Sequence, residues 1–279
     1  MSIARLLLEY YQELDRGFHL YWIEAQRDYG RETVHGLRVN LKKQRSFFYL
    51  LEALTPSFVA VEASEVFDGV YGKAGKVRDL QVERALIEKN ERKLQLEHRL
   101  SAWLEKQEGR RVLNLQQYES GHSMLPFRKL SERVGRIIGQ LPEKGLEAQL
   151  GAYYIKIIRG VIAFVRGNKA AGEDLHDLRR FIKELFYNLR FLQRYTGQEA
   201  LQCGALVRLD ELQRALGKWH DLDFAISHLE KKKKVVDVGF RAHLEAERQT
   251  SEAEARAMFN GLEAALKELE ERICEHLGE

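Results

Sequence analysis

Apolar residues recur along this chain at the three- and four-residue spacing that places them on one face of an α-helix. In the first half, the periodic stretches are Ile3–Arg27, Thr33–Leu54, Val59–Tyr71, Gly75–Lys106 and Leu125–Leu141. In the second half they are Leu146–Arg166, Asp174–Tyr195, Glu199–Leu216 and two further long helices toward the C-terminus. The alternating pattern typical of strands is absent. The sequence therefore predicts an all-α fold, with Thr33 and Asp174 as candidate N-caps and a loop within Gly109–Pro126.

Two segments about half a chain apart resemble each other, which indicates an internal repeat. The segment from Val34 reads VHGLRVNLKKQRSFFYLLEAL, and the segment from Leu175 reads LHDLRRFIKELFYNLRFLQRY. A second shared pattern follows each at nearly the same distance, reading GKAGKVRDLQV from Gly72 and ALGKWHDLDF from Ala215. The common order predicts a duplication with repeats at residues 1–143 and 144–279 and a seam near Leu141–Gly145.

The segment from Val34 is expected to form a helix, called the first motif helix, and the segment from Leu175 the second. One face of the first motif helix is cationic. On a helical wheel that starts at His35, the arc of about 80° at 100° per residue also holds Arg38, Lys42 and Arg45. The other side of that wheel is apolar and is expected to pack in a core, with Leu37, Leu41, Phe48 and Leu51. The second motif repeats the cationic face with His176, Arg179, Lys183 and Arg190, and adds Tyr187. Because like charges on one face repel each other, a repeated cationic face favours a site for a polyanion over a merely solvated surface.

The two glycine-lysine segments that follow are expected to interrupt a helix and to add basic groups. Gly75 and Gly217 permit a sharp turn or a close approach of the backbone. The basic groups that could extend a phosphate-binding surface are Lys76, Arg78, Lys218 and His220. Asp79 and Asp221 are expected to hold a neighbouring histidine or arginine, or to cap a helix, and are not counted as ligands.

These residues resemble the CHAD domain, the conserved histidine α-helical domain. The likeness rests on His-x-x-Arg-Val-x-x-Lys-Lys-x-Arg at His35–Arg45, on its second copy at His176 and on Gly-x-x-Arg-Asp-Leu-x-Val at Gly75–Val82, and it covers nearly the whole chain. The resemblance implies two four-helix bundles related by a pseudo-twofold axis, with a basic central groove or pore that binds inorganic polyphosphate. Some members of the family sit beside a triphosphate-tunnel catalytic domain. This chain lacks the Glu-Lys-Glu strand signature of such a domain and is expected to be a stand-alone binding module.

The predicted polyphosphate-binding residues are the basic and histidine side chains of the four segments and their flanks. They are His35, Arg38, Lys42, Lys43, Arg45, Lys73, Lys76, Arg78, His176, Arg179, Arg180, Lys183, Arg190, Arg214, Lys218 and His220. In the second copy, Glu184 and Phe186 stand where the family pattern has cations, so the N-terminal half is expected to carry the larger share of binding. Affinity is expected to rise as the pH drops toward about 6, where the histidines would become charged.

Composition limits the other classes of function. A net charge of +3 does not by itself indicate a polyanion partner. Cys203 and Cys274 lie far apart in sequence and fit a reduced, cytoplasmic protein, with association with polyphosphate granules left open. The N-terminus does not have the pattern of a signal peptide, and no stretch approaches the roughly 18 uncharged apolar residues of a membrane span. The Lys231–Lys234 run is interpreted as a solvated helix face or turn, and most aromatic residues as core, Trp219 included.

Three alternatives remain at this point. The histidines could bind a metal ion or act as a phosphoacceptor module, although the surrounding arginines and lysines disfavour a divalent cation. The basic helices could bind nucleic acid, although Tyr49 and Tyr187 are the nearest aromatic side chains for base stacking. An enzyme is not expected, because the sequence has no glycine-rich phosphate loop, nucleophile elbow or acidic two-metal cluster. No catalytic residue, metal site or cofactor is predicted.

Overall fold

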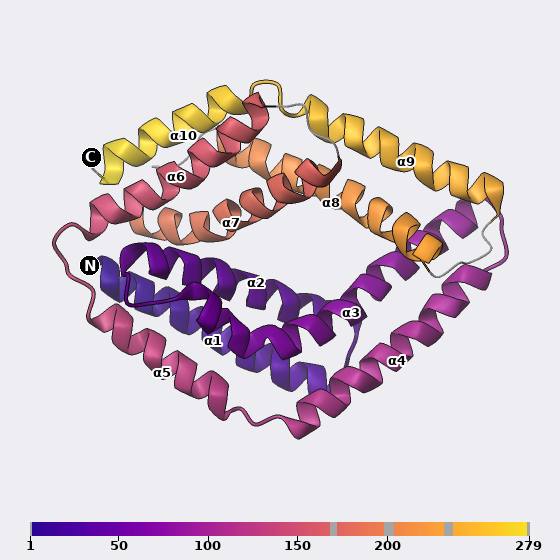
Figure 1. The fold of residues 1–279 in the computed structure, drawn as a ribbon, viewed down its shortest axis with the longest axis horizontal. Coiled ribbons are helices and arrows are strands. Elements are labelled where there is room, and N and C mark those ends of the chain that lie inside the picture. The colour runs from indigo at the N-terminus through magenta and orange to yellow at the C-terminus, as the bar shows by residue number, and fades with distance from the viewer. Residues whose placement is uncertain (1, 168–171, 198–203, 232–236, 278–279) are drawn as a thin grey trace.

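The computed structural model describes residues 2–167, 172–197, 204–231 and 237–277, and every regular element within these ranges is an α-helix (Figure 1). The helices are α1 (Ile3–Arg27), α2 (Arg31–Leu54), α3 (Ala60–Lys93), α4 (Arg99–Gly121), α5 (Leu125–Gly139), α6 (Leu146–Arg166), α7 (Gly172–Thr196), α8 (Gly204–Lys231), α9 (Val238–Ala257) and α10 (Leu262–Leu277). The predicted all-α fold is confirmed, and α1 and α6 have the predicted ends.

The helix interruptions predicted at the two glycine-lysine segments are wrong. Helix α3 runs without a break through Gly75, and α8 runs through Gly217. A glycine in a helix interior costs only about 1 kcal/mol relative to alanine, and buried neighbours can offset this. Val77 and Trp219 are such neighbours, since both are buried in the core. The loop predicted within Gly109–Pro126 is confirmed as the short connection between α4, which extends to Gly121, and α5, which begins at Leu125; the rest of that stretch is helix.

Neither predicted N-cap residue precedes its helix. Helix α2 begins at Arg31, and its N-cap residue is Gly30, which has no side chain to make a capping hydrogen bond. Helix α7 begins at Gly172, so Asp174 lies within it, and the Asp174 side chain lies outside the described part of the structure. Three other sequence features also lie outside the described residues: the start of the expected helix Glu199–Leu216, Cys203 and the last three lysines of the Lys231–Lys234 run.

One hydrophobic core extends through both halves of the chain. Helix α2 packs against α6 and α7, so the apolar faces of the two motif helices meet in this core. The apolar residues predicted to face inward are buried: Leu37, Leu41, Phe48 and Leu51 of α2. Leu178, Ile182 and Leu185 of α7 are buried in the same core. Trp219 is 1% exposed, which confirms its interpretation as a core residue. Burial of these faces fixes which side of α2 and α7 carries the charged residues.

A polar contact inside the core joins α7 to α2 and α6. Asn188 is fully buried, and its Nδ2 donates to the Ser46 carbonyl oxygen at 3.0 Å and to the Tyr153 hydroxyl at 2.7 Å. Because unpaired buried amide groups are costly, these bonds favour one relative position of the two motif helices. The predicted seam lies in the connection between α5 and α6, and the duplication with its pseudo-twofold axis stays a prediction.

The long helices form two hairpins, α3–α4 and α8–α9, whose ends lie together at one end of the molecule (Figure 1). A smaller cluster there includes Leu80, Leu104, Leu222 and Phe240. Within it, Glu83 of α3 is fully buried, and its Oε2 lies 2.7 Å from Nδ1 of His228 in α8. Burial raises the pKa of Glu83 to about 8. The two halves are therefore joined both at the motif helices and at the hairpin ends.

Within the described part of the chain, α6 is the one helix long and apolar enough to cross a membrane by length and composition. Its residues Leu150, Tyr154, Ile158 and Ile162 are buried inside the protein. It packs against α10, α7 and α2. These contacts are those of a core helix.

Candidate anion-binding site

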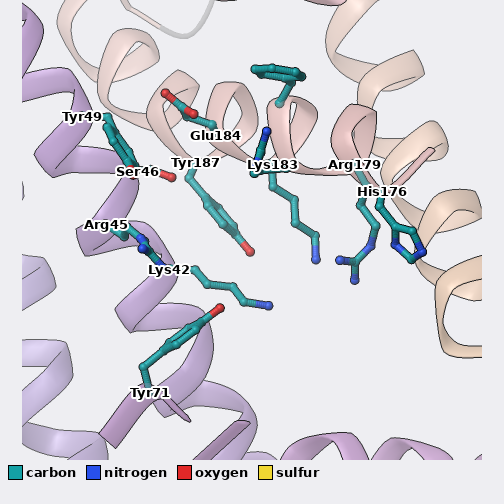
Figure 2. A pocket seen from close by; sticks show the side chains of 12 residues that line it. Lys42, Arg45, Ser46, Tyr49, Tyr71, His176, Arg179, Lys183, Glu184 and Tyr187 are labelled. Atoms are coloured by element: carbon teal, nitrogen blue, oxygen red, sulfur yellow. The ribbon is translucent and has the colours of Figure 1, made fainter. Parts of the chain in front are cut away.

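The cationic faces of α2 and α7 look toward the same space, although they come from opposite halves of the chain. A cavity of about 550 Å³ lies between them. Its lining residues are Lys42, Arg45, Ser46, Tyr49, Tyr71, His176, Arg179, Arg180, Phe181, Lys183, Glu184 and Tyr187. Figure 2 shows five of these side chains with their polar ends directed into one space: Lys42, Tyr71, Arg179, Lys183 and Tyr187. Two stretches that only resembled each other in sequence thus form a single site.

Helix α3 packs against α2, the first motif helix, and contacts its Arg38. Arg38 is largely buried, its side chain being 14% exposed. Its guanidinium lies 5.0 Å from the Tyr71 ring centre, its Nη1 donates to the Tyr71 carbonyl oxygen at 3.3 Å, and its Nη2 is 3.8 Å from an Asp79 oxygen. Asp79 therefore holds an arginine, as its position in the sequence suggested, and it caps no helix because it lies inside α3.

Gly75 makes room for this arginine. A Cβ built on Gly75 would lie 2.1 Å from Nη1 of Arg38, which is far closer than two such atoms can approach. The close approach predicted for Gly75 is therefore present, within a continuous helix instead of a turn. The same reasoning does not apply to Gly217, because a Cβ there would meet nothing within 4 Å.

Burial and mutual repulsion weaken the protonated forms of the cavity lysines. Burial first, then the charges of Arg179 and Lys42, lower the pKa of Lys183 to about 6. Burial, then the charges of Arg38 and Arg179, lower the pKa of Lys42 to about 8. Burial also lowers the pKa of the Arg179 guanidinium, whose Nε is buried without a hydrogen-bond partner. The site is thus a place where positive charge is crowded and incompletely neutralised.

Two carboxylates temper that charge. Burial raises the pKa of Asp79, and the positive charge of Arg38 acts against this rise. Burial likewise raises the pKa of Asp221, against the charges of Arg179 and Lys183. Both aspartates lie near the cations of α2 and α7, so they lower the repulsion in the empty site. Among the lining residues of the cavity itself, Glu184 is the acidic one, and its Oε1 accepts a hydrogen bond from Tyr153 at 3.2 Å.

Two of the histidines, His35 and His220, are poor sources of positive charge. Burial, then the charges of Arg179 and His176, lower the pKa of His220 to about 3. Burial and the charge of Arg78 lower the pKa of His35. His176 is held differently: its ring lies 4.7 Å from the Trp219 ring and 5.0 Å from the His220 ring, and its Nε2 is 3.6 Å from Asp223. Hence His35 and His220 stay neutral at physiological pH.

The structure brings some of the predicted residues together and leaves others apart. Six line the cavity: Lys42, Arg45, His176, Arg179, Arg180 and Lys183. Four more lie close enough to change the charge state of those residues or of their neighbours: His35, Arg38, Arg78 and His220. The remaining six do not line it: Lys43, Lys73, Lys76, Arg190, Arg214 and Lys218. Helix α7 supplies more lining cations than α2, so the described geometry gives no advantage to the N-terminal copy.

Several predicted residues outside the cavity have other partners. Lys218 Nζ is 3.2 Å from Glu254, and Arg214 Nη2 donates to Asp210 at 2.7 Å. Lys73 Nζ lies 5.4 Å from the Tyr118 ring centre, on the side of α3 that meets α4. Helices α3 and α8 are both continuous, so the positions of their lysines around each helix are set by the helical period.

Sequence reasoning missed part of the lining. Ser46, Tyr71 and Phe181 were not singled out, and Tyr49 and Tyr187 were weighed only as possible stacking partners. Ser46 could have been found, because it follows Lys42 by one helical turn on the same face. Tyr71 lies one turn before Gly75, but its role depends on how α3 packs against α2, which the sequence does not show. In the described residues, no group of three or more His, Cys, Asp or Glu side chains could hold a metal ion.

The fold and the cavity define an all-helical protein with a basic cavity between α2 and α7. The family model of the CHAD domain matches residues 16–230, and the chain belongs to that family. The crystal structure of the CHAD domain from the plant Ricinus communis superposes with a TM-score of 0.69 and 18% identity, covering 96% of this chain and 92% of that one. PptA from Streptomyces chartreusis superposes with a TM-score of 0.62 and 11% identity, covering 96% and 99%. At these identities the likeness concerns the fold alone. No curated protein sequence matches the chain.

Proposed function

We propose that this protein binds inorganic polyphosphate, without a catalytic step, in the cavity between α2 and α7. One observation carries the proposal: Lys42, Arg179 and Lys183 converge on a single cavity from both halves of the chain. Lys42 and Arg179 repel each other in the empty site, and burial with this crowding lowers the pKa of Lys183 to about 6. A ligand with closely spaced negative charges would relieve the repulsion and favour the protonated form of Lys183. A linear phosphate chain has one negative charge on each unit, so it is a ligand of this kind.

The side chains suit phosphate oxygens. Arginine presents a planar set of donors that can bond two oxygens at once, and lysine supplies a compact charge with three donors. The hydroxyls of Tyr71 and Tyr187 could donate further hydrogen bonds at the same place. Membership of the CHAD family supports the proposal, since domains of this family bind polyphosphate in general.

The experiment is titration calorimetry with polyphosphates of defined length. The double variant Lys42→Ala/Arg179→Ala should weaken binding by at least about ten-fold, which corresponds to 1.4 kcal/mol. The matched control is Arg128→Ala/Lys129→Ala, which removes the same charge from exposed positions on α5. Helical circular dichroism should be the same for all three proteins. Equal losses in both variants would mean that net charge, and not this cavity, holds the ligand.

Nucleic acid is the competing ligand to test, because three tyrosines line the cavity and aromatic rings can stack on bases. Single-stranded RNA and long-chain polyphosphate are compared in one competition assay at matched phosphate concentration. Polyphosphate should remain bound. Displacement of polyphosphate by RNA would assign the site to nucleic acid.

A further inference from the structure

A second cavity adjoins the cationic one. It measures about 690 Å³ and lies between α2, α6 and α7. Its lining residues are Tyr49, Glu52, Ala53, Gln149, Ala152, Tyr153, Lys156, Ile157, Gly160, Phe181 and Glu184. Three of these, Tyr49, Phe181 and Glu184, also line the first cavity. The two spaces therefore share a wall, and a ligand could extend from one into the other.

The chemistry changes at this shared wall. Counted around α7 from His176 at 100° per residue, the cations Arg179, Lys183 and Arg180 fall between about 300° and 40°. Glu184 follows at about 80° and Phe181 at about 140°. A ligand that moves around this helix thus leaves the cations, passes a carboxylate and reaches an aromatic ring. In Figure 2, Tyr49 and Glu184 lie together on one side of the cavity, away from Arg179 and His176.

The second cavity does not suit more phosphate. Ala53, Ala152 and Ile157 make much of its wall apolar, and its acidic side chains outnumber its basic one. The carboxylates are Glu52 and Glu184, and the single cation is Lys156. Phosphate groups would be repelled by these carboxylates. An uncharged aromatic ring with amino groups would fit instead, because it can contact the aromatic walls and donate hydrogen bonds to the carboxylates. The volume lies within the range of about 300–1,000 Å³ usual for small-molecule sites.

We propose that the site takes a nucleoside polyphosphate, with the phosphate chain among Lys42, Arg179 and Lys183 and the base in the second cavity. The proposal rests on the proposed function, because the same cations would hold the phosphates. It adds that the site prefers a ligand whose phosphate chain ends, near Glu184, in an organic aromatic group. Inorganic polyphosphate has no such group. Phe181 is 36% exposed at the border of the two cavities, where it would face the base.

The test compares ATP with methyl triphosphate, both without divalent cations and at fixed ionic strength. The two ligands have the same three phosphates, and only ATP has a nucleoside. ATP should bind about ten-fold more tightly, the factor that corresponds to 1.4 kcal/mol and lies within the range observed for stacking of one base. Equal affinities for ATP and methyl triphosphate would overturn the inference.

A variant that fills the second cavity adds a structural control. Ala53→Leu/Ala152→Leu places two aliphatic side chains there, at exposed helical positions where leucine is well tolerated. It should remove the ten-fold preference for ATP and leave the affinity for methyl triphosphate unchanged. Ala102→Leu/Ala242→Leu, at exposed positions on α4 and α9, should keep the preference.

The outcomes separate this inference from the proposed function. Binding of long-chain polyphosphate without any preference for ATP would overturn only the nucleoside assignment. Loss of affinity for both triphosphates in Ala53→Leu/Ala152→Leu, with circular dichroism unchanged, would also overturn it, because the filled space would then not be specific for the base. Failure of the unchanged protein to bind any of these ligands would overturn the proposed function as well.

Discussion

Nη1 of Arg38 lies only 2.1 Å from the position that a Cβ on Gly75 would take. The glycine in the middle of α3 thus allows an arginine of α2 to lie against α3, beside Tyr71 and Asp79. Tyr71 also lines the cationic cavity, so the contact between Arg38 and Tyr71 links the Gly75 region of α3 to the site. This relationship gives a packing reason for a glycine at this position of a continuous helix.

Gly75→Ala should therefore weaken polyphosphate binding without unfolding the protein. The new methyl group would displace the Arg38 guanidinium, whereas alanine is the better helix former, so the free energy of unfolding should stay the same or rise. We expect a loss of roughly five-fold in affinity, about 1 kcal/mol. Calorimetry and urea unfolding measure the two effects. Gly72→Ala is the control on the same helix, because a Cβ there would meet nothing within 4 Å. A similar loss in Gly72→Ala would contradict this account.

Binding should depend on pH through Lys42 and Lys183 and not through His220. The pKa values of Lys42 and Lys183 in the empty site are about 8 and about 6, and a bound polyanion would raise both. Binding would then take up protons, so affinity should increase as the pH falls from about 9 to about 6 and level off below that. Affinity is thus expected to rise at lower pH, in the direction that the sequence also predicts with the histidines as the groups that gain charge. His220, with a pKa of about 3, is not the cause of this rise.

Lys183→Arg and His220→Gln distinguish these two causes. An arginine would remain protonated throughout this range, so Lys183→Arg should flatten the pH profile and reduce the proton uptake measured in buffers of different ionisation enthalpy. His220→Gln should leave the profile unchanged. If His220→Gln removed the dependence and Lys183→Arg did not, the lysine account would be wrong.

Affinity should fall steeply with salt, because each phosphate neutralised by the protein releases counterions. Arg179→Ala should reduce the slope of log affinity against log salt by roughly 0.7–1, the value for one contact. Arg92→Ala removes the same charge near the end of α3, where Arg92 pairs with Glu88. Its slope should equal that of the unchanged protein. Equal slopes for Arg179→Ala and the unchanged protein would exclude a phosphate contact by Arg179.

Asn188→Ala should lower the free energy of unfolding by about 2–3 kcal/mol, because it removes two buried hydrogen bonds, from Asn188 Nδ2 to the Ser46 carbonyl oxygen and to the Tyr153 hydroxyl. Urea denaturation measures this change. Asn114→Ala, at an exposed position on α4, should change it by less than about 0.5 kcal/mol. A loss of similar size in both variants would show that the buried contact is not what matters.

The sequence by itself determined the helical fold and the two cationic helix faces. The three- and four-residue spacing of Leu37, Leu41 and Phe48 fixes which face of α2 is buried, and the charged face follows because the two share one helix. The ends of α1 and α6 were also predictable, since both are punctuated by short polar or glycine-containing connections. These are local properties that the helical period converts directly into structure.

Only the tertiary structure decided which cations meet. Lys42 and Lys183 are far apart in sequence, and α7 packs against α2 through buried contacts that no local pattern reveals. The packing of α3 against α2 adds Tyr71 to the site, whereas Lys76 and Lys218 lie outside it. The tertiary structure also lowers the pKa of His220 and of Lys183, because burial and the closeness of other charges act through space and not along the chain.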